Sequence, residues 1–280
     1  MSKVRCTSIF IGIIFLLSTS AWAAGPTIKV TQVDMSNYPE IIVYVSVTDD
    51  KGSPLGGLTQ EDFEVTEDGV PVTLTDFAGT GDVRMADIVF VFDTTTSMVE
   101  EVDGMKRTSL AFAEKLERSG LDYRLGLVDF GDVINRVENP DGQLTDDAQQ
   151  FKGWINEIRL AGGGYDIPEF SLGALQRATQ MSFRDGVLKI FILITDAPPH
   201  HYGDWPDAGV SFDDPNLTLA NTLQLLANTN VTTYIVAPTH SDYLQIVEET
   251  NGQFFNIHGS SDFTTIIDEI GGLIATQYRL

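Results

Sequence analysis

Beyond residue 84, short apolar runs alternate with stretches of helical periodicity, and this alternation constrains the fold more than any other feature. The runs are rich in β-branched and aromatic residues, which is typical of strands buried on both faces of a parallel sheet. We therefore expect residues 84–280 to form an α/β domain with a doubly wound, mostly parallel six-stranded sheet. The expected strands are 87–92, 123–130, 133–137, 188–195, 231–237 and 253–258, and the expected helices are 104–118, 146–158, 170–181, 216–228, 243–250 and 262–276.

Residues 24–80 show a different pattern, because apolar and polar residues alternate there with a period of two. Such alternation predicts strands with one buried face, and Asp68-Gly69 between two of them is a hairpin signal. We expect a small β-sandwich without helices, with residues 78–82 as the linker to the α/β domain. No cluster of residues with catalytic spacing occurs in this module, which favours a structural or docking role.

The first 23 residues have the organisation of a secretory signal peptide. Lys3 and Arg5 precede an apolar stretch of nine residues, which is too short to span a bilayer comfortably, and Ala21-Trp22-Ala23 fits a cleavage site. We expect cleavage after Ala23, no transmembrane segment in the mature chain, and a secreted or periplasmic location. An uncleaved anchor is the alternative interpretation of the same residues.

The chain is strongly acidic, with 40 Asp and Glu against 17 Lys and Arg and a formal charge of −23. An acidic surface repels nucleic acid, so a nucleic-acid partner is excluded. It also raises the local concentration of cations and favours partners with basic surfaces.

The first apolar strand of the α/β domain ends in a group of oxygen donors, within the sequence DIVFVFDTTTS. Asp93, Thr95 and Ser97 follow one another at a spacing of two, and hard oxygen donors suit Mg²⁺, Mn²⁺ or Ca²⁺. A second apolar strand ends at Asp196, and doubly wound sheets bind ligands at the carboxyl ends of strands where the strand order reverses. If these two strands are neighbours, both carboxylates lie in one crevice. A helix cap is the alternative role for Thr95 and Ser97.

These residues resemble the von Willebrand factor type A domain and its metal-ion-dependent adhesion site, over roughly residues 87–276. Asp93-Thr94-Thr95-Thr96-Ser97 is similar to the first motif of the family, and Thr195-Asp196 is similar to the last. The resemblance implies that Thr95 and Ser97 bind the ion directly, while Asp93 and Asp196 bind it directly or through water. It also implies a Rossmann-like fold and a binding or adhesion function. The segment GLTQEDFEVTEDGVP is similar to modules that precede such domains in secreted bacterial proteins.

The middle motif departs from the adhesive members of that family, which place a metal-binding Thr in this loop. The loop here reads GGGYDIPE and offers no Thr, so we expect Asp166 to act as the substitute ligand. For Glu169 we expect an interaction with the dipole of the helix that follows. Exposed aromatic and imidazole groups are expected to form a partner-binding rim around the crevice. The residues assigned to this rim are Tyr165, His200, His201, Tyr202 and Trp205.

The resemblance leads to the hypothesis that the chain binds a protein or glycoprotein partner through a carboxylate that completes the shell of a Mg²⁺ ion, without catalysis. Phosphotransfer of the haloacid-dehalogenase type is an alternative, with Asp93 as nucleophile, but the chain lacks a suitably placed Lys and a paired-acid motif after Asp196. A cation that only stabilises the fold is another alternative. The tandem His200-His201 is also compatible with zinc ligation, although we favour the rim, because adjacent loop residues rarely converge on one ion.

Overall fold

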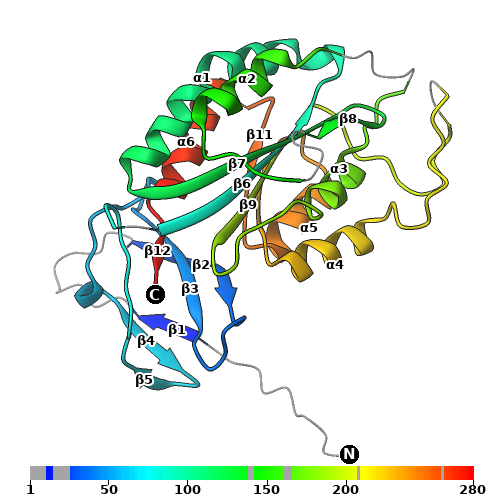
Figure 1. Cartoon of the computed structure of the whole chain (residues 1–280). Coiled ribbons are helices and arrows are strands. Elements are labelled where there is room, and N and C mark those ends of the chain that lie inside the picture. Colours follow the sequence, from blue (N-terminus) through cyan, green and yellow to red (C-terminus); the bar gives the residue numbers. More distant parts are fainter. Residues whose placement is uncertain are drawn as a thin grey trace, which may run out of the picture.

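The computed structural model describes residues 26–82, 84–137, 142–160, 166–206, 209–259 and 262–280, together with the backbone of residues 11–14. The chain forms a large α/β unit and a smaller β unit that lies beside one end of it (Figure 1). Among the described residues, no helix is both long and apolar enough to cross a membrane.

A six-stranded sheet with strand order β11-β10-β9-β6-β7-β8 forms the centre of the α/β unit. The neighbouring strands run parallel, except that β8 is antiparallel to β7. This arrangement confirms the predicted doubly wound sheet. The strands are β6 (Arg84–Asp93), β7 (Leu121–Phe130), β8 (Ile134–Val137), β9 (Leu188–Ile194), β10 (Thr232–Ala237) and β11 (Gln253–Asn256).

Six helices cover the two faces of this sheet (Figure 1). Ile88, Phe90 and Phe92 of β6 face one core, and the intervening Val89 and Val91 face the other, as expected for a strand buried on both sides. Helices α1, α2 and α6 contribute to the first core, and α3, α4 and α5 to the second. The helices are α1 (Val99–Arg118), α2 (Ala148–Glu157), α3 (Ser171–Ala178), α4 (Leu219–Thr229), α5 (Ser241–Glu249) and α6 (Phe263–Ala275).

Helix α1 begins five residues earlier than predicted, since the predicted start was residue 104. A single 3₁₀ turn, η2 (Thr96–Met98), joins the end of β6 to the helix. The polar residues after β6 are therefore held between a buried strand and the first turn of a long helix.

The small unit consists of two three-stranded sheets, β1-β4-β5 and β12-β3-β2. Its core contains Val43, Val45, Val47, Phe63 and Tyr278. The small unit also contains the short 3₁₀ helix η1 (Gln60–Asp62), although we expected a module without helices. The strands are β1 (Ile11–Ile14), β2 (Thr27–Asp34), β3 (Ile42–Thr48), β4 (Glu64–Glu67), β5 (Val70–Val72) and β12 (Tyr278–Arg279).

Both ends of the chain contribute to the small unit. The backbone of β1, which lies within the predicted leader, pairs antiparallel with β4. The last residues, which the prediction assigned to the α/β domain, return as β12 and pair with β3 (Figure 1). The aromatic side chain of Tyr278 is fully buried against Phe63 and Phe77, so burial of apolar surface accounts for this return.

The small unit contacts the α/β unit at the amino ends of the central strands. The Gln32 side chain donates to the carbonyl of Val187 at 3.2 Å and accepts from the Lys189 N–H at 3.1 Å. The Thr232 hydroxyl, at the start of β10, donates to the carbonyl of Thr31 in β2 at 2.8 Å. The carboxyl ends of the central strands lie at the opposite edge of the sheet, away from this interface.

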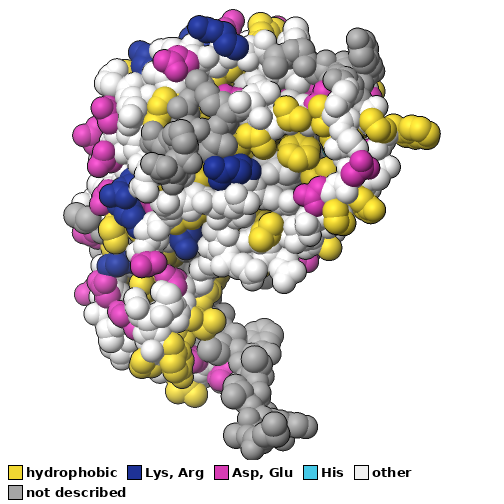
Figure 2. Space-filling model, turned by 45° about the vertical axis from the view of Figure 1, so that its right-hand side comes forward, with side chains coloured by type: hydrophobic (Ala, Val, Ile, Leu, Met, Phe, Trp, Pro, Cys, Tyr) yellow, Lys and Arg dark blue, Asp and Glu magenta, His cyan; other side chains and the backbone are white. Residues whose placement is uncertain are grey.

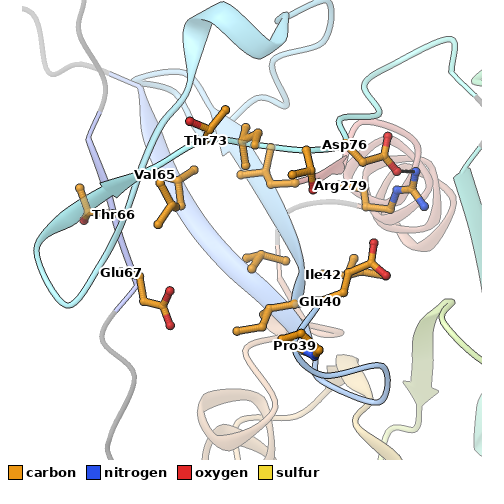
Figure 3. Close-up of a pocket in the computed structure, with 15 residues that line it drawn as sticks. Pro39, Glu40, Ile42, Val65, Thr66, Glu67, Thr73, Asp76 and Arg279 are labelled. Carbon is orange, nitrogen blue, oxygen red and sulfur yellow. Dashed lines mark hydrogen bonds and ion pairs between the residues drawn. The ribbon is translucent and has the colours of Figure 1, made fainter.

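A cavity of about 450 Å³ lies within the small unit (Figure 3). Its walls combine aliphatic and polar side chains, with Glu40 before β3, Glu67 at the end of β4 and an ion pair between Arg279 and Asp76 at one side. None of the predicted site residues that the structure describes lines it, so it is separate from the acidic residues at the ends of β6 and β9.

Candidate functional site

The buried carboxylate of Asp93 lies at the carboxyl end of β6 and is held by hydroxyl and amide donors. One oxygen, Oδ1, accepts hydrogen bonds from the backbone N–H and the hydroxyl of Thr95, at 2.9 and 2.8 Å. The other, Oδ2, accepts from the hydroxyl of Thr195 at 2.6 Å. Thr195 was not among the predicted site residues, and its place directly before Asp196 is the sequence signal that could have identified it.

A second contact links the loop after β6 to the end of β9. The Ser97 hydroxyl lies 3.1 Å from the Thr95 hydroxyl and donates to Asp196 Oδ1, also at 3.1 Å. These segments meet because β6 and β9 are parallel neighbours, with Phe92 opposite Ile194. The structure thus brings together four of the five residues predicted to bind metal, at the point where the strand order reverses.

Burial raises the pKa of Asp93 to about 6. The hydrogen bonds from Thr195 and Thr95 oppose this shift, and the nearby charge of Asp196 adds to it. A buried carboxylate in such surroundings is stabilised in its ionised form when a cation binds beside it.

The fifth predicted ligand, Asp166, lies in a different group. Its Oδ1 is 3.6 Å from Nε2 of His200, and Oδ1 of Asp132 is 3.8 Å from the same nitrogen. Within the described part of the chain, these three residues form the one set of at least three acidic, His or Cys ligands whose atoms all lie within 4.8 Å of one another. Asp93 and Asp196 do not belong to that set, so the role of Asp166 beside them stays a prediction.

His200 was predicted to lie on the rim, but its side chain is fully buried. The backbone N–H of His200 donates to the carbonyl of Glu169, which fixes the loop against the start of α3. The imidazole ring stacks on Phe212, with centroids 3.7 Å apart, and its Nδ1 lies 3.0 Å from Asp204 Oδ2. The assignment to a solvent-facing rim is therefore wrong for this residue, because stacking and hydrogen bonding turn it inwards.

The other predicted rim residues differ in exposure. Trp205 is 89% exposed and Tyr202 is 55% exposed, as a partner-contact surface requires. His201 is more constrained, because its Nε2 lies 2.8 Å from a carboxylate oxygen of Asp242. Tyr165 lies outside the described residues. Ile167 was not predicted, and it adds an apolar side chain that is 74% exposed.

Glu169 lies just before α3, and its carboxyl group is buried. The residue is only 6% exposed, and its Oε2 has no hydrogen-bond partner among the described residues. Burial raises the pKa of Glu169 to about 9, and four neighbouring carboxylates contribute to the same shift: Asp93, Asp132, Asp196 and Asp166. An unsatisfied carboxyl group among four other acids favours a positive charge nearby, and the expected interaction with the dipole of α3 stays a prediction.

Known proteins provide three comparisons. Residues 87–258 match the model of the von Willebrand factor A domain family. The chain is 30% identical over 155 residues to "Alpha-protein kinase vwkA" of Dictyostelium discoideum, which covers 53% of this chain and 24% of that protein. It is also similar to the solved structure "von Willebrand factor type A from Catenulispora acidiphila", with a TM-score of 0.51 and 14% identity, covering 92% of this chain and 51% of that one.

The structural match supports the fold alone, because its identity is low, and the chain spans about a quarter of its Dictyostelium relative. The family model, in contrast, covers more than half of the chain and includes both the loop after β6 and the end of β9. This chain belongs to the von Willebrand factor A domain family.

Proposed function

We propose that this chain is a secreted binding or adhesion protein that uses a divalent cation, held by Asp93, Thr95, Ser97 and Asp196, to engage a carboxylate of a protein partner. Domains of this family mediate protein interactions and often bind a divalent metal. The observation that carries the proposal is the convergence of two hydroxyls and two carboxylates from β6 and β9. All four side chains present oxygen, which suits Mg²⁺ or Mn²⁺.

The composition of this site explains how a partner could bind. Two neutral hydroxyls and two carboxylates leave the ion with coordination positions that water fills. An acidic side chain of a partner can replace one of these water molecules. Because the chain has a formal charge of −23, we expect the surface around that partner carboxylate to be basic, with an association that weakens at high salt.

Exposed apolar side chains on the loops around the acidic group supply a contact surface. Trp205, Tyr202 and Ile167 are more than half exposed and belong to the two loops that flank the acidic group. Figure 2 shows hydrophobic and acidic side chains side by side along one edge of the α/β unit. Large aromatic residues dominate the energetics of many interfaces, so these residues are the specificity candidates.

The location outside the cytoplasm rests on the predicted leader, residues 1–23. We propose that cleavage after Ala23 releases the mature chain to the periplasm or the exterior. Mass determination of the N-terminus of the exported protein tests this part separately.

The binding proposal is tested by a pull-down from the native extracellular fraction, with the exported, mature chain as bait. We expect a partner that is retained in Mg²⁺, released by EDTA and lost in Asp93→Ala. Asp103→Ala is a matched control, because this exposed aspartate lies on α1 beyond the site. Isothermal titration with Mg²⁺ shows whether each variant still binds the ion. Partner binding that is unchanged in EDTA and in Asp93→Ala would contradict the proposal. If the chain binds Mg²⁺ but binds its partner equally well without it, the cation has a structural role only.

The enzymatic alternative has one geometrical argument against it. A nucleophilic Asp must approach its substrate, yet Asp93 is fully buried and both of its oxygens accept hydrogen bonds. The Dictyostelium relative is named as a kinase, but the match covers 24% of it and assigns no catalytic residue here. Hydrolysis of p-nitrophenyl phosphate with Mg²⁺, abolished in Asp93→Ala, would favour the enzyme.

A further inference from the structure

We propose that Asp132, Asp166 and His200 form a second cation site, which binds a divalent transition metal of the zinc class. This histidine site is distinct in composition from the all-oxygen site at Asp93 and does not depend on the function proposed above. Its three ligand atoms lie within 4.8 Å of one another.

The imidazole of His200 is oriented as a metal ligand would be. Its Nδ1 lies 3.0 Å from Asp204 Oδ2, which has no proton to donate when ionised, so Nδ1 is the protonated nitrogen. The lone pair of Nε2 then points away from Asp204, towards Asp132 and Asp166. Histidine ligands of metals commonly donate their second nitrogen to a carboxylate in this way, which fixes the tautomer and the ring orientation.

The ring has little freedom to turn away from this direction. It is fully buried and stacks on Phe212 at 3.7 Å with an interplanar angle of 20°. The same Asp204 oxygen accepts the backbone N–H of His201 at 2.8 Å, which anchors the acceptor as well. In the described structure, Nε2 is buried and makes no hydrogen bond. A buried nitrogen without a partner is costly, and a metal ion would satisfy it.

The separations fit the geometry of zinc better than that of magnesium. Nε2 lies 3.6 Å from the Asp166 oxygen and 3.8 Å from the Asp132 oxygen. Tetrahedral bonds of about 2.0–2.1 Å place two ligand atoms about 3.3–3.4 Å apart. Octahedral Mg²⁺ needs about 3.0 Å between neighbouring ligands and prefers oxygen, so it suits this group less well.

The charge of the group also fits a divalent ion. The carboxylates of Asp132 and Asp166 balance two positive charges, and the imidazole is neutral when it binds. Asp166 is 37% exposed in its side chain, whereas Asp132 and His200 are buried, so the site opens to solvent on one side. An ion can enter from that side and retain a water molecule as its fourth ligand.

The test uses the full chain, freed of metal, and titrates it with Zn²⁺ and with Co²⁺ as a spectroscopic probe. We expect one Zn²⁺ equivalent and a visible Co²⁺ spectrum of tetrahedral intensity. Asp166→Asn should weaken Zn²⁺ binding by at least about 10-fold. Loss of a group that only holds a metal ligand typically costs about 10–100-fold in affinity, and Asp166 would bind the ion itself. His200→Gln should abolish the Co²⁺ spectrum. His258→Gln is the matched control, because it removes an exposed imidazole outside the group.

Two further results separate this site from the site at Asp93. Asp93→Asn should weaken Mg²⁺ binding and leave Zn²⁺ binding unchanged. Asp166→Asn should weaken Zn²⁺ binding whether or not its Mg²⁺ binding changes. If His200→Gln fails to fold, as judged by circular dichroism, the half-exposed Asp166→Asn decides the outcome. Absence of a tetrahedral Co²⁺ spectrum in the wild type, or equal Zn²⁺ affinity in Asp166→Asn and His258→Gln, would overturn the proposal.

Discussion

Replacement of Glu169 by Gln should stabilise the metal-free protein at neutral pH. The Glu169 carboxyl is buried among four other acids, and its pKa is raised from 4.5 to about 9. In the unfolded chain the group ionises near its ordinary pKa, so folding at pH 7.5 requires uptake of a proton. Because pH 7.5 is three units above 4.5, this proton uptake costs about 4 kcal/mol of folding free energy, at about 1.4 kcal/mol per pH unit.

This figure is an upper bound, because relaxation of the side chains around Glu169 and mutual titration of the acids reduce it. We expect Glu169→Gln to raise the free energy of unfolding by about 2 kcal/mol in EDTA at pH 7.5. For a domain of this size, that change corresponds to an increase of about 4–8 °C in Tm. With saturating Mg²⁺ or Zn²⁺ the gain should shrink, since bound cations favour the ionised carboxylate.

The sign of the pH dependence provides the sharper test. Between about pH 4.5 and 9 the folded state binds more protons than the unfolded state, so wild-type stability falls as the pH rises through this window. Glu169→Gln lacks this contribution. Its free energy of unfolding should therefore be close to that of the wild type at pH 4.5 and exceed it increasingly towards pH 8. The assay is chemical denaturation in EDTA across that range.

A matched control keeps the overall change in charge constant. Glu269→Gln removes the same charge from an exposed position on α6, and we expect a small difference that does not vary with pH. If Glu169→Gln gives a stability difference that is equally flat, or destabilises the protein in EDTA at pH 7.5, then burial among the four acids does not strain the Glu169 carboxyl group.

Two further outcomes follow from the geometry. Because the pKa of Asp93 is raised to about 6, Mg²⁺ competes with a proton below that pH. Titration calorimetry should show the Mg²⁺ affinity falling by up to 10-fold per pH unit below about pH 6. A Mg²⁺ affinity that does not vary with pH would contradict this expectation. Arg184→Ala should lower stability by about 3–5 kcal/mol in urea denaturation, because Arg184 donates at 2.8 Å to the fully buried Asp87. Asp87→Asn in the same chain should recover part of the loss, and a loss below about 1 kcal/mol in the single variant would disprove the reasoning.

Sequence periodicity was sufficient to predict the elements of the α/β unit. The apolar run before Asp93 identifies a strand buried on both faces, and the predicted helices overlap those of the structure. The local motif after β6 and the acid after β9 were also visible, because each is written in a few consecutive residues. Apolar pattern and short-range spacing are local properties, so the sequence alone carries them.

Tertiary structure decided which of these residues meet. The parallel pairing of β6 with β9 places Ser97 beside Asp196, although 99 residues separate them in the chain. Stacking on Phe212 turned His200 from an expected rim residue into a buried one, and packing placed Glu169 among four acids. Burial of Tyr278 in turn returned the last strand to the small unit. The sequence by itself determined the elements and the chemistry at their ends, whereas strand order and burial arise from contacts between distant segments and were fixed only by the folded chain.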